Sequence, residues 1–280
     1  MQGIILGKFQ EGDEYKVKEV TDPGNYELFK GFSKRTVNLI FKDDVLVGWM
    51  HLYLPDSSLR SGFVYIYVVP RYRRQGIGSC AYGQAETQLQ KIGCNWWSSY
   101  QESKAADQFA MSVGFDYTNT NSYLVHNGNI VPASTDGIRM CRMEDYPAAP
   151  DIWSREYAAM HTRIGLPYKR KELSAAERKA EYDDFCKNIS NSFVLEVEDK
   201  IVGIGSLFSD NTGIGSLAVD SAYSGRGYGM RLAAFLTNEC IRRGCPKPCL
   251  YCEAGNDNAM HLYKKIGYVE QSRETVAIKN

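Results

Sequence analysis

Residues 68–78 read VVPRYRRQGIG, and residues 219–229 read VDSAYSGRGYG. In each stretch an apolar run leads into a loop of spaced glycines, and apolar residues at helical spacing follow. Main-chain N–H groups at a helix start lack internal partners, the helix dipole is positive there, and glycine lets an anion approach the chain. The pattern therefore indicates a strand, an anion-binding loop and a helix, present twice. A single such loop is also compatible with a tight turn before a packing helix.

The two loops belong to a longer internal repeat. Equivalent glycines are Gly48 and Gly203, Gly76 and Gly227, and Gly114 and Gly267, at separations of 155, 151 and 153 residues. Three landmarks at nearly one separation predict a duplicated domain, and 280 residues are enough for two domains. Turn-forming residues cluster at 127–137. We therefore expect a first domain at 1–130, a linker at 131–137 and a second domain at 138–280.

Both copies show the same order of elements. Residues 37–54 and 192–207 carry apolar runs on both sides of a polar turn, which predicts a β-hairpin. A third strand, the glycine loop, a helix, a short strand and a second helix ending at Gly114 or Gly267 follow. The expected fold is α/β of the mixed α+β kind. It consists of two tandem domains, each a mixed, mostly antiparallel sheet flanked by helices.

Composition describes a globular protein without electrostatic bias. The hydrophobic fraction is 44%, and 33 basic residues balance 33 acidic ones, so no overall field attracts nucleic acid or an anionic membrane. The first residues, MQGIILGKF, lack the features of a secretory signal, and no segment approaches the roughly 20 apolar residues that span a bilayer. Eight cysteines in such a chain are expected to be reduced. We expect a cytoplasmic protein without nucleic-acid or membrane partners, and the sequence does not predict its oligomeric state.

The glycine loops resemble those of the GCN5-related N-acetyltransferases, in which [Q/R]-x-x-G-x-[G/A] follows a strand ending in a V-x-P-like segment. The first copy fits fully, whereas the second has Ser224 in the place of the basic residue and Arg226 nearby. The resemblance covers nearly the whole chain and implies acetyl-CoA as cosubstrate. The residues it implies for cofactor binding are Val68, Val69, Arg73, Arg74, Gly76, Ile77 and Gly78 in the first copy, and Leu217, Ala218, Val219, Ser224, Gly225, Arg226, Gly227, Tyr228 and Gly229 in the second.

A second signature separates the copies. Residues 256–268, NDNAMHLYKKIGY, resemble the family segment N-x-x-A-x-x-[L/F]-Y-x-x-x-G-[F/Y]. The resemblance implies that Asn256 orients the cofactor and that Tyr263 is the general acid that protonates the departing thiolate. Tyr263 is also compatible with a packed aromatic residue over the helix–sheet seam. In the first copy Ser103 and Ala110 stand at these positions. We infer that the first copy binds CoA or serves as a scaffold and that the second performs the transfer.

The implied reaction is direct attack of a small-molecule amine on the thioester, with its carbonyl polarised by a main-chain N–H around Leu217–Val219. The general base stays open among Glu253, Asp210 and His161, each of which also fits a solvated surface role. The leading hypothesis is an acetyl-CoA-dependent N-acetyltransferase. The alternative is a CoA-binding regulatory or scaffolding protein without turnover.

Two further patterns are given structural interpretations. Cys245, Cys249 and Cys252 have the C-x3-C-x2-C spacing of an iron–sulfur ligand set, but a strand over these residues sends neighbouring side chains to opposite faces, so we expect no metal. Trp153, Tyr157 and His161 share one helix face in the region where family members shape the acceptor pocket. Core packing is the default interpretation of that stripe.

Overall fold

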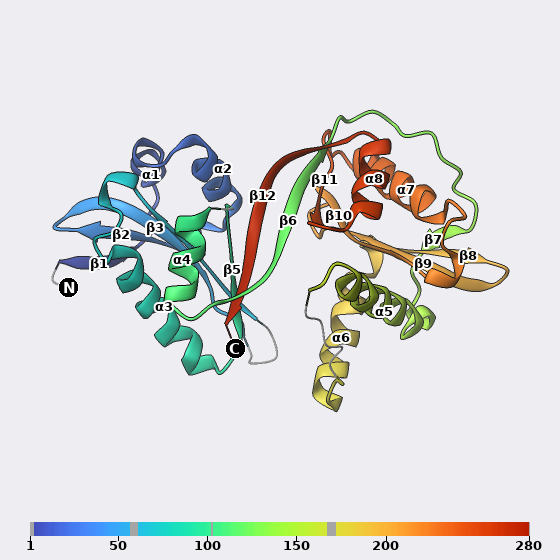
Figure 1. The fold of residues 1–280 in the computed structure, drawn as a ribbon, viewed down its shortest axis with the longest axis horizontal. Helices are drawn as coiled ribbons and strands as arrows, with labels where there is room; N and C mark the ends of the chain where they lie inside the picture. Colours follow the sequence, from blue (N-terminus) through green and yellow to red (C-terminus); the bar gives the residue numbers. More distant parts are fainter. Residues whose placement is uncertain (1–2, 57–60, 102, 167–171, 280) are drawn as a thin grey trace. The chain divides into compact units, whose positions relative to one another are not determined.

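The computed structural model describes residues 3–56, 61–101, 103–166 and 172–279, and its chain forms two compact units (Figure 1). The first unit comprises Met1–Thr118 and Thr275–Asn280, and the second comprises Asn119–Glu274. Within the described ranges no helix combines the length and apolar character needed to cross a membrane.

The first unit is a sheet with helices on both faces. Its strand order is β1 (Ile4–Lys8), β2 (Val37–Lys42), β3 (Val45–Tyr53), β4 (Gly62–Val68), β5 (Trp96–Gln101) and the end of β12 (Tyr268–Lys279). Its helices are α1 (Glu14–Val20), α2 (Pro23–Gly31), α3 (Ile77–Ile92) and α4 (Lys104–Ser112). Strands β1 to β4 are antiparallel, and β5 is parallel to β4. Side chains alternate along β4, so that Val64 packs under α3 and α4 while Tyr65 and Tyr67 pack with α1 and α2.

The second unit repeats this plan. Its strand order is the start of β12, β6 (Asp116–His126), β11 (Cys249–Glu253), β10 (Gly213–Val219), β9 (Lys200–Leu207), β8 (Ser192–Val197) and β7 (Ile138–Met140). Its helices are α5 (Ala148–Arg163), α6 (Ala175–Lys187), α7 (Tyr228–Arg242) and α8 (Asp257–Lys265). A β-bulge between Ile214 and Ser216 shifts the alternation of β10. As a result Ile214 and Leu217 pack under α7 and α8, while Ala218 packs with α5.

These elements confirm the mixed α/β class and both predicted hairpins. Two residues connect the strands of each hairpin, and all of them have left-handed φ: Asp43 (50°), Asp44 (62°), Glu198 (51°) and Asp199 (59°). Consecutive left-handed residues match the right-handed twist of the flanking strands. The same turn at both sites supports descent of the two copies from one ancestral domain.

The compact units differ from the sequence repeat at their edges. Residues 119–130, expected in the first domain, lie in the second unit, where Leu124 of β6 pairs with Leu250 of β11. The chain end, expected in the second domain, completes the first unit, where Lys279 Nζ donates to the carbonyl of Val113 at 2.7 Å and to Glu86 Oε1 at 2.5 Å. Each unit therefore contains a strand segment from the other sequence copy: the end of β12 in the first unit and most of β6 in the second.

An ion-pair network holds the start of the second unit. Arg139 of β7 donates to both carboxylate oxygens of Asp145, at 2.7 and 2.8 Å, and also to Glu196 of β8. The Asp145 carboxylate accepts from the Arg142 amide at 2.7 Å and is almost fully buried. Hydrogen bonding to Arg139 lowers the pKa of Asp145 from its ordinary value of 3.8. The network thereby fixes the turn that leads into α5.

Replacing Asp145 by Asn should destabilise the protein at neutral pH by about 2 kcal/mol, because Arg139 loses a charged partner. Since folding lowers the pKa of Asp145 below 3.8, its contribution is complete above that value and is lost as pH falls through the lower, folded-state pKa. Urea unfolding at several pH values should show the wild-type and Asp145→Asn stabilities converging in acid. A constant difference across that range would contradict this role.

Candidate active site

The two glycine loops have one backbone conformation. Gly76 (φ 77°, ψ 1°) and Gly227 (φ 79°, ψ 2°) are left-handed and directly precede α3 and α7. Two residues earlier, Arg74 and Gly225 are also left-handed, with φ of 62° and 75°. A left-handed arginine is strained, so the fold maintains this shape even without glycine. Both loops therefore present a helix N-terminus with unpaired N–H groups.

The last glycine of each loop serves helix packing. A Cβ added to Gly78 would lie 3.3 Å from the Phe109 ring of α4, and one added to Gly229 would lie 3.3 Å from Leu262 Cδ1 of α8. The missing side chain lets the second helix lie directly against the loop. In the second unit this contact places α8, the helix that carries Tyr263, against the glycine loop.

Beyond a short paired segment, the parallel strands of each unit diverge. Strand β4 pairs with β5 only at Gly62 and Phe63, and β10 pairs with β11 only at Gly213 and Ile214. A Cβ on Gly213 would lie 1.8 Å from the Cys249 carbonyl oxygen, so the closest approach requires glycine. Beyond these pairs, the facing edges of the two strands have no partner strand among the described residues.

Main-chain groups point into the space between the diverging strands. The Asp220 amide donates to Val202 at 2.8 Å, toward β9. Because amides alternate along a strand, those of Leu217 and Val219 point the other way, toward β11, whereas Ala218 faces β9. In the first unit the Val69 amide bonds to Val47, and the Val68 carbonyl faces the space and accepts from Arg73 Nε at 2.8 Å.

Basic side chains border both loops. Arg73 lies 5.9 Å from the Tyr67 ring centroid, whereas Ser224 at the equivalent position has no such group. In the second unit Arg226 lies over Tyr223 at 5.3 Å and Arg231 over Tyr228 at 5.1 Å. Arg231 was not predicted, although it stands four residues after Gly227 and so shares its helix face. Arg231 gives this loop a positive charge, whereas Ser224, at the position equivalent to Arg73, carries none.

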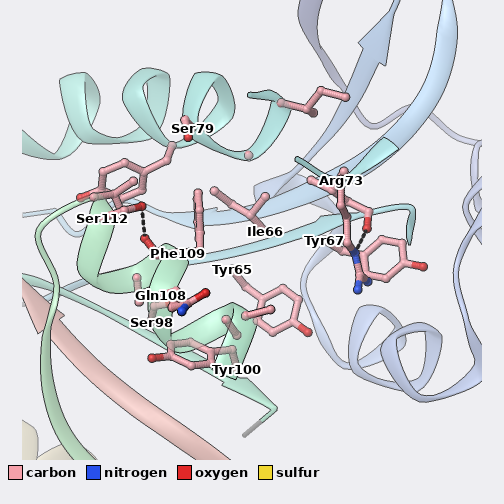
Figure 2. A pocket seen from close by; sticks show the side chains of 18 of the residues that line it. Tyr65, Ile66, Tyr67, Arg73, Ser79, Ser98, Tyr100, Gln108, Phe109 and Ser112 are labelled. Atoms are coloured by element: carbon pink, nitrogen blue, oxygen red, sulfur yellow. Dashed lines mark hydrogen bonds between the residues drawn. The ribbon is translucent and has the colours of Figure 1, made fainter. Parts of the chain in front are cut away.

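The first unit contains a cleft of about 730 Å³ that begins at its loop (Figure 2). Ile66 comes from β4, Arg73 comes from the loop before α3, and Ser98 and Tyr100 come from β5. Phe109 and Ser112 come from α4. The cleft follows the divergence of β4 and β5. Its shape suits an extended ligand with an anionic end at the loop.

Tyr263 is a buried phenol in the second unit. Its ring packs edge-on against Tyr268 at 5.7 Å, and burial raises the pKa of its hydroxyl. Among the described residues no group forms a hydrogen bond with this hydroxyl. Asn256 directly precedes α8, and its Oδ1 accepts from Arg163 Nη2 at 3.4 Å. The second unit therefore combines a glycine loop at a helix start with a buried tyrosine whose hydroxyl has no hydrogen-bond partner among the described residues.

A family model described as the acetyltransferase (GNAT) family matches residues 9–115 and 152–268, which together are more than half of the chain. The chain belongs to the acetyltransferase (GNAT) family. Membership implies acyltransferase activity in general, and the two matches establish the tandem organisation.

Solved structures of similar fold include other GNAT proteins. One is a GCN5-related N-acetyltransferase from Sphaerobacter thermophilus, with a TM-score of 0.65 and 17% identity, covering 100% of this chain and 96% of that chain. Another is a tandem GNAT protein from the clavulanic acid biosynthesis pathway, with a TM-score of 0.52 and 15% identity, covering 87% and 82%. A third is a GNAT acetyltransferase from Colwellia psychrerythraea, with a TM-score of 0.52 and 13% identity, covering 98% of each chain. At these identities the likeness concerns the fold.

The first GNAT domain contains a phenol in another place. Tyr82 of α3 packs against Phe115 at 5.5 Å and 59°, much as Tyr263 packs against Tyr268 at 5.7 Å and 66°. Phe115 and Tyr268 are equivalent in the repeat. The tyrosine that packs on this ring thus lies on α3, which follows the glycine loop, in the first domain and on α8 in the second.

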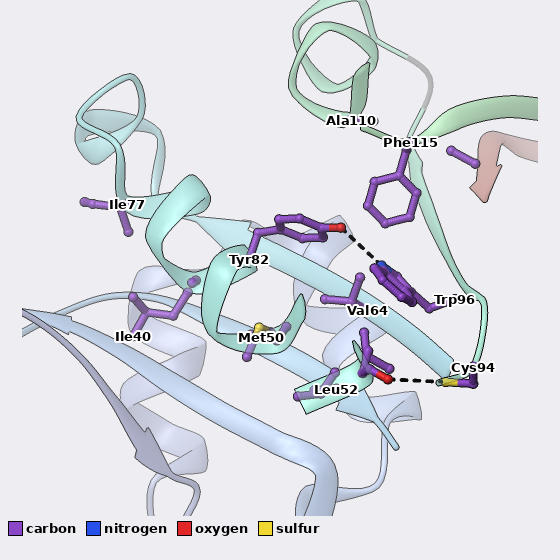
Figure 3. Packing of buried hydrophobic residues seen from close by; sticks show 14 of the residues in the cluster. Ile40, Met50, Leu52, Val64, Ile77, Tyr82, Cys94, Trp96, Ala110 and Phe115 are labelled. Carbon is purple, nitrogen blue, oxygen red and sulfur yellow. Dashed lines mark hydrogen bonds between the residues drawn. The ribbon is translucent and has the colours of Figure 1, made fainter. Parts of the chain in front are cut away.

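This move exchanges a large and a small residue. The first domain has Tyr82 and Ala110, where the second has Ala233 and Tyr263. The Tyr82 hydroxyl accepts from Trp96 Nε1 at 3.1 Å (Figure 3). It also donates to Glu86 Oε1 at 3.3 Å. Its proton is therefore committed to a structural hydrogen bond.

The structure separates the three candidate bases of the second domain. Asp210 is exposed and accepts from the Thr212 amide and hydroxyl at 3.0 and 2.7 Å, which makes it a turn residue. Glu253 and His161 lie together, with His161 Nε2 2.9 Å from Glu253 Oε2. Tyr157 also reaches Glu253, through a hydrogen bond of 2.5 Å. Of the helix stripe expected in the core, His161 is buried but Trp153 is 36% exposed.

The cysteines take no visible part in the site. All eight are free thiols, and burial raises the pKa of both Cys240 and Cys252 to about 12. In the part of the chain that the structure describes, no group of three or more His, Cys, Asp or Glu side chains is arranged to hold a metal ion.

The exchange of sizes predicts coupling between positions 82 and 110. Ala110→Tyr alone should destabilise the protein by about 1–3 kcal/mol because Tyr82 fills the space. Tyr82→Ala alone should cost about 3–5 kcal/mol by leaving a cavity. The double variant should cost less than the two together, as measured by urea unfolding. Additive effects would show that the two rings do not occupy one space.

Proposed function

We propose that the protein is an acetyl-CoA-dependent N-acetyltransferase whose second unit transfers the acetyl group to the amine of a small molecule. The observation that carries this proposal is the Tyr263 side chain, which is buried and whose hydroxyl forms no hydrogen bond with the described residues. Its helix, α8, packs against the glycine loop through the contact of Leu262 with Gly229. The first unit has a loop of the same conformation, but the hydroxyl of its Tyr82 is hydrogen-bonded to Glu86 and Trp96.

In this proposal the loop residues Ser224–Gly229 bind the pyrophosphate of the cosubstrate through N–H groups at the start of α7, with Arg226 and Arg231 beside them. The pantetheine lies between the diverging β10 and β11. The amides of Leu217 and Val219 point into this space and are placed to polarise the thioester carbonyl. Asn256, which directly precedes α8, is proposed to orient the cosubstrate.

Tyr263 supplies the proton that the leaving group needs. The amine lone pair forms a C–N bond to the carbonyl carbon, the C–S bond breaks, and the thiolate takes the hydroxyl proton of Tyr263. Because burial raises the pKa of Tyr263, the phenol is protonated at neutral pH and can act as the acid. No covalent enzyme intermediate is needed.

The first unit is proposed to bind CoA without turnover. Its loop has the same conformation, Arg73 provides charge, and a cleft of about 730 Å³ extends from the loop. This cleft and the absence of an arginine at Ser224 are what favour the alternative function, a CoA-binding regulatory or scaffolding protein. The balanced charge suits a small acceptor, and eight free thiols suit a reducing compartment such as the cytoplasm.

Tyr263→Phe should lower the rate of thiol release from acetyl-CoA by about 10²–10⁴-fold, because the thiolate loses its proton donor. CoA affinity should stay unchanged, since the ring remains. The measurement is thiol release with a panel of primary amines, beside CoA titration. Tyr268→Phe, which removes a neighbouring buried hydroxyl bonded to Thr237, is the matched control and should keep its rate. Tight CoA binding without turnover by the wild type on any amine would favour the alternative function.

A further inference from the structure

We propose that Trp153, Tyr157, His161 and Glu253 form the acceptor subsite, that the acceptor is a cationic ammonium compound, and that Tyr157 passes its proton to Glu253. This inference rests on the proposed function and adds the substrate class and the path of the proton.

Helix α5 fastens the subsite to both sides of the space between the diverging strands. At the end of β10, Glu156 Oε1 accepts from the Ser221 amide at 3.1 Å, and Arg155 Nη2 donates to Asp220 at 2.8 Å. From the same helix, Tyr157 and His161 bond to Glu253, the last residue of β11. The helix thus places these side chains beside the proposed thioester position.

The carboxylate of Glu253 is buried and receives two donors. Its side chain is 10% exposed and that of His161 is 3% exposed. The Tyr157 hydroxyl donates to Oε1 at 2.5 Å, and His161 Nε2 lies 3.0 and 2.9 Å from the two oxygens. A buried carboxylate is costly without such partners. These contacts therefore hold the Glu253 carboxylate at a fixed place.

An aromatic stack leads from solvent to this carboxylate. Trp153 stacks on Tyr157 at 4.7 Å and 13°, and Tyr157 lies 4.4 Å from the His161 ring. Trp153 is 36% exposed, whereas His161 is buried. Aromatic faces next to a carboxylate attract cations and offer nothing to an anion. This arrangement selects an ammonium group.

Both arginines of α5 have polar partners among the described residues. Arg155 is engaged by Asp151, Glu156 and Asp220, and Arg163 contacts Asn256. None of these contacts involves Glu253. Its carboxylate is therefore the charge at the buried end of the aromatic stack.

The first unit lacks the equivalent group. Trp96 and Cys249 begin β5 and β11 at matched places in their sheets, so Tyr100 corresponds to Glu253. The carboxylate and the uncommitted Tyr263 therefore occur in the same unit. This coincidence is expected if one unit performs the whole reaction.

The proposed proton path balances. The ammonium N–H proton moves to the Tyr157 oxygen as the Tyr157 proton moves to Glu253 Oε1, which frees the amine lone pair. That pair forms the C–N bond, the C–S bond breaks, and sulfur takes the proton of Tyr263. The nitrogen then loses a second proton, which reaches the Tyr263 oxygen through solvent and restores the phenol. Glu253 releases its own proton to solvent.

Ligand binding tests the subsite without requiring turnover. Eight primary amines of increasing size, among them phenethylamine, and their alcohol counterparts, among them 2-phenylethanol, are titrated with and without CoA. At least one amine should bind at least about tenfold more tightly than its alcohol, and Glu253→Gln should remove the difference. Equal binding within every pair, or a preference that survives Glu253→Gln, would overturn the proposal. A preference in a protein that transfers no acetyl group would refute the proposed function but not the ammonium subsite.

Steady-state kinetics test the proton path. Tyr157→Phe keeps the stack and should lower kcat by at least about tenfold while amine affinity is kept, whereas Glu253→Gln should weaken both. Tyr146→Phe removes another tyrosine–glutamate hydrogen bond of this unit, to Glu181 at 3.0 Å, and is the matched control that should leave kcat unchanged. Wild-type kcat in Tyr157→Phe, in a protein that turns over, would rule out the relay.

Discussion

Two parallel strands that pair over two residues and then separate are the feature on which the rest of each domain depends. In the second unit the closest approach requires Gly213, and every residue of β10 beyond Ile214 is left with an open edge toward β11. Unpaired main-chain groups are normally a cost in a folded protein. Here the unpaired groups of the strand face a space that ends at the start of a helix. An extended ligand with an anionic end can therefore bond to the strand groups and to the N–H groups of the helix start.

The elements around this space have separate tasks. Gly227 sets the left-handed turn that begins α7, and Gly229 lets α8 approach it. Helix α5 then ties the two strand ends from the opposite face of the sheet, where Ala218 packs with it. Rigid elements thus position the loop, the phenol and the carboxylate, which is what a reaction that depends on orientation needs.

Duplication has kept the geometry while the chemistry has diverged. The two loops agree in φ even where Arg74 replaces Gly225, and the two hairpins turn in the same way. The aromatic ring, in contrast, lies on α3 in one domain and α8 in the other, with its hydroxyl committed in the first and available in the second. A packed core tolerates such an exchange because the total volume is retained. In the proposed function, only the hydroxyl of the second domain can serve as the proton donor.

Local patterns were sufficient to predict the hairpins, the loops and the two helices that follow each loop, because each depends on periodicity or on glycine over a few residues. The exchange of β6 and the end of β12 between the two units was not predictable from the sequence. Alternation of side chains in residues 116–126 does not specify which unit's sheet they join. The pairing of Tyr82 with Phe115 and of Tyr157 with Glu253 was missed for a similar reason: the partners are far apart in sequence and meet only through packing. Arg231 had a signal in its spacing from Gly227, but it lies outside the loop pattern.

The most direct test of the central claim, that both loops bind CoA and only the second serves transfer, is calorimetric CoA stoichiometry measured beside acetyl transfer in Gly76→Val and Gly227→Val. A valine at either left-handed position blocks the ligand's approach to the loop. The account predicts two sites in the wild type and one in each variant, with transfer lost only in Gly227→Val. Transfer that is lost in Gly76→Val and kept in Gly227→Val would contradict it.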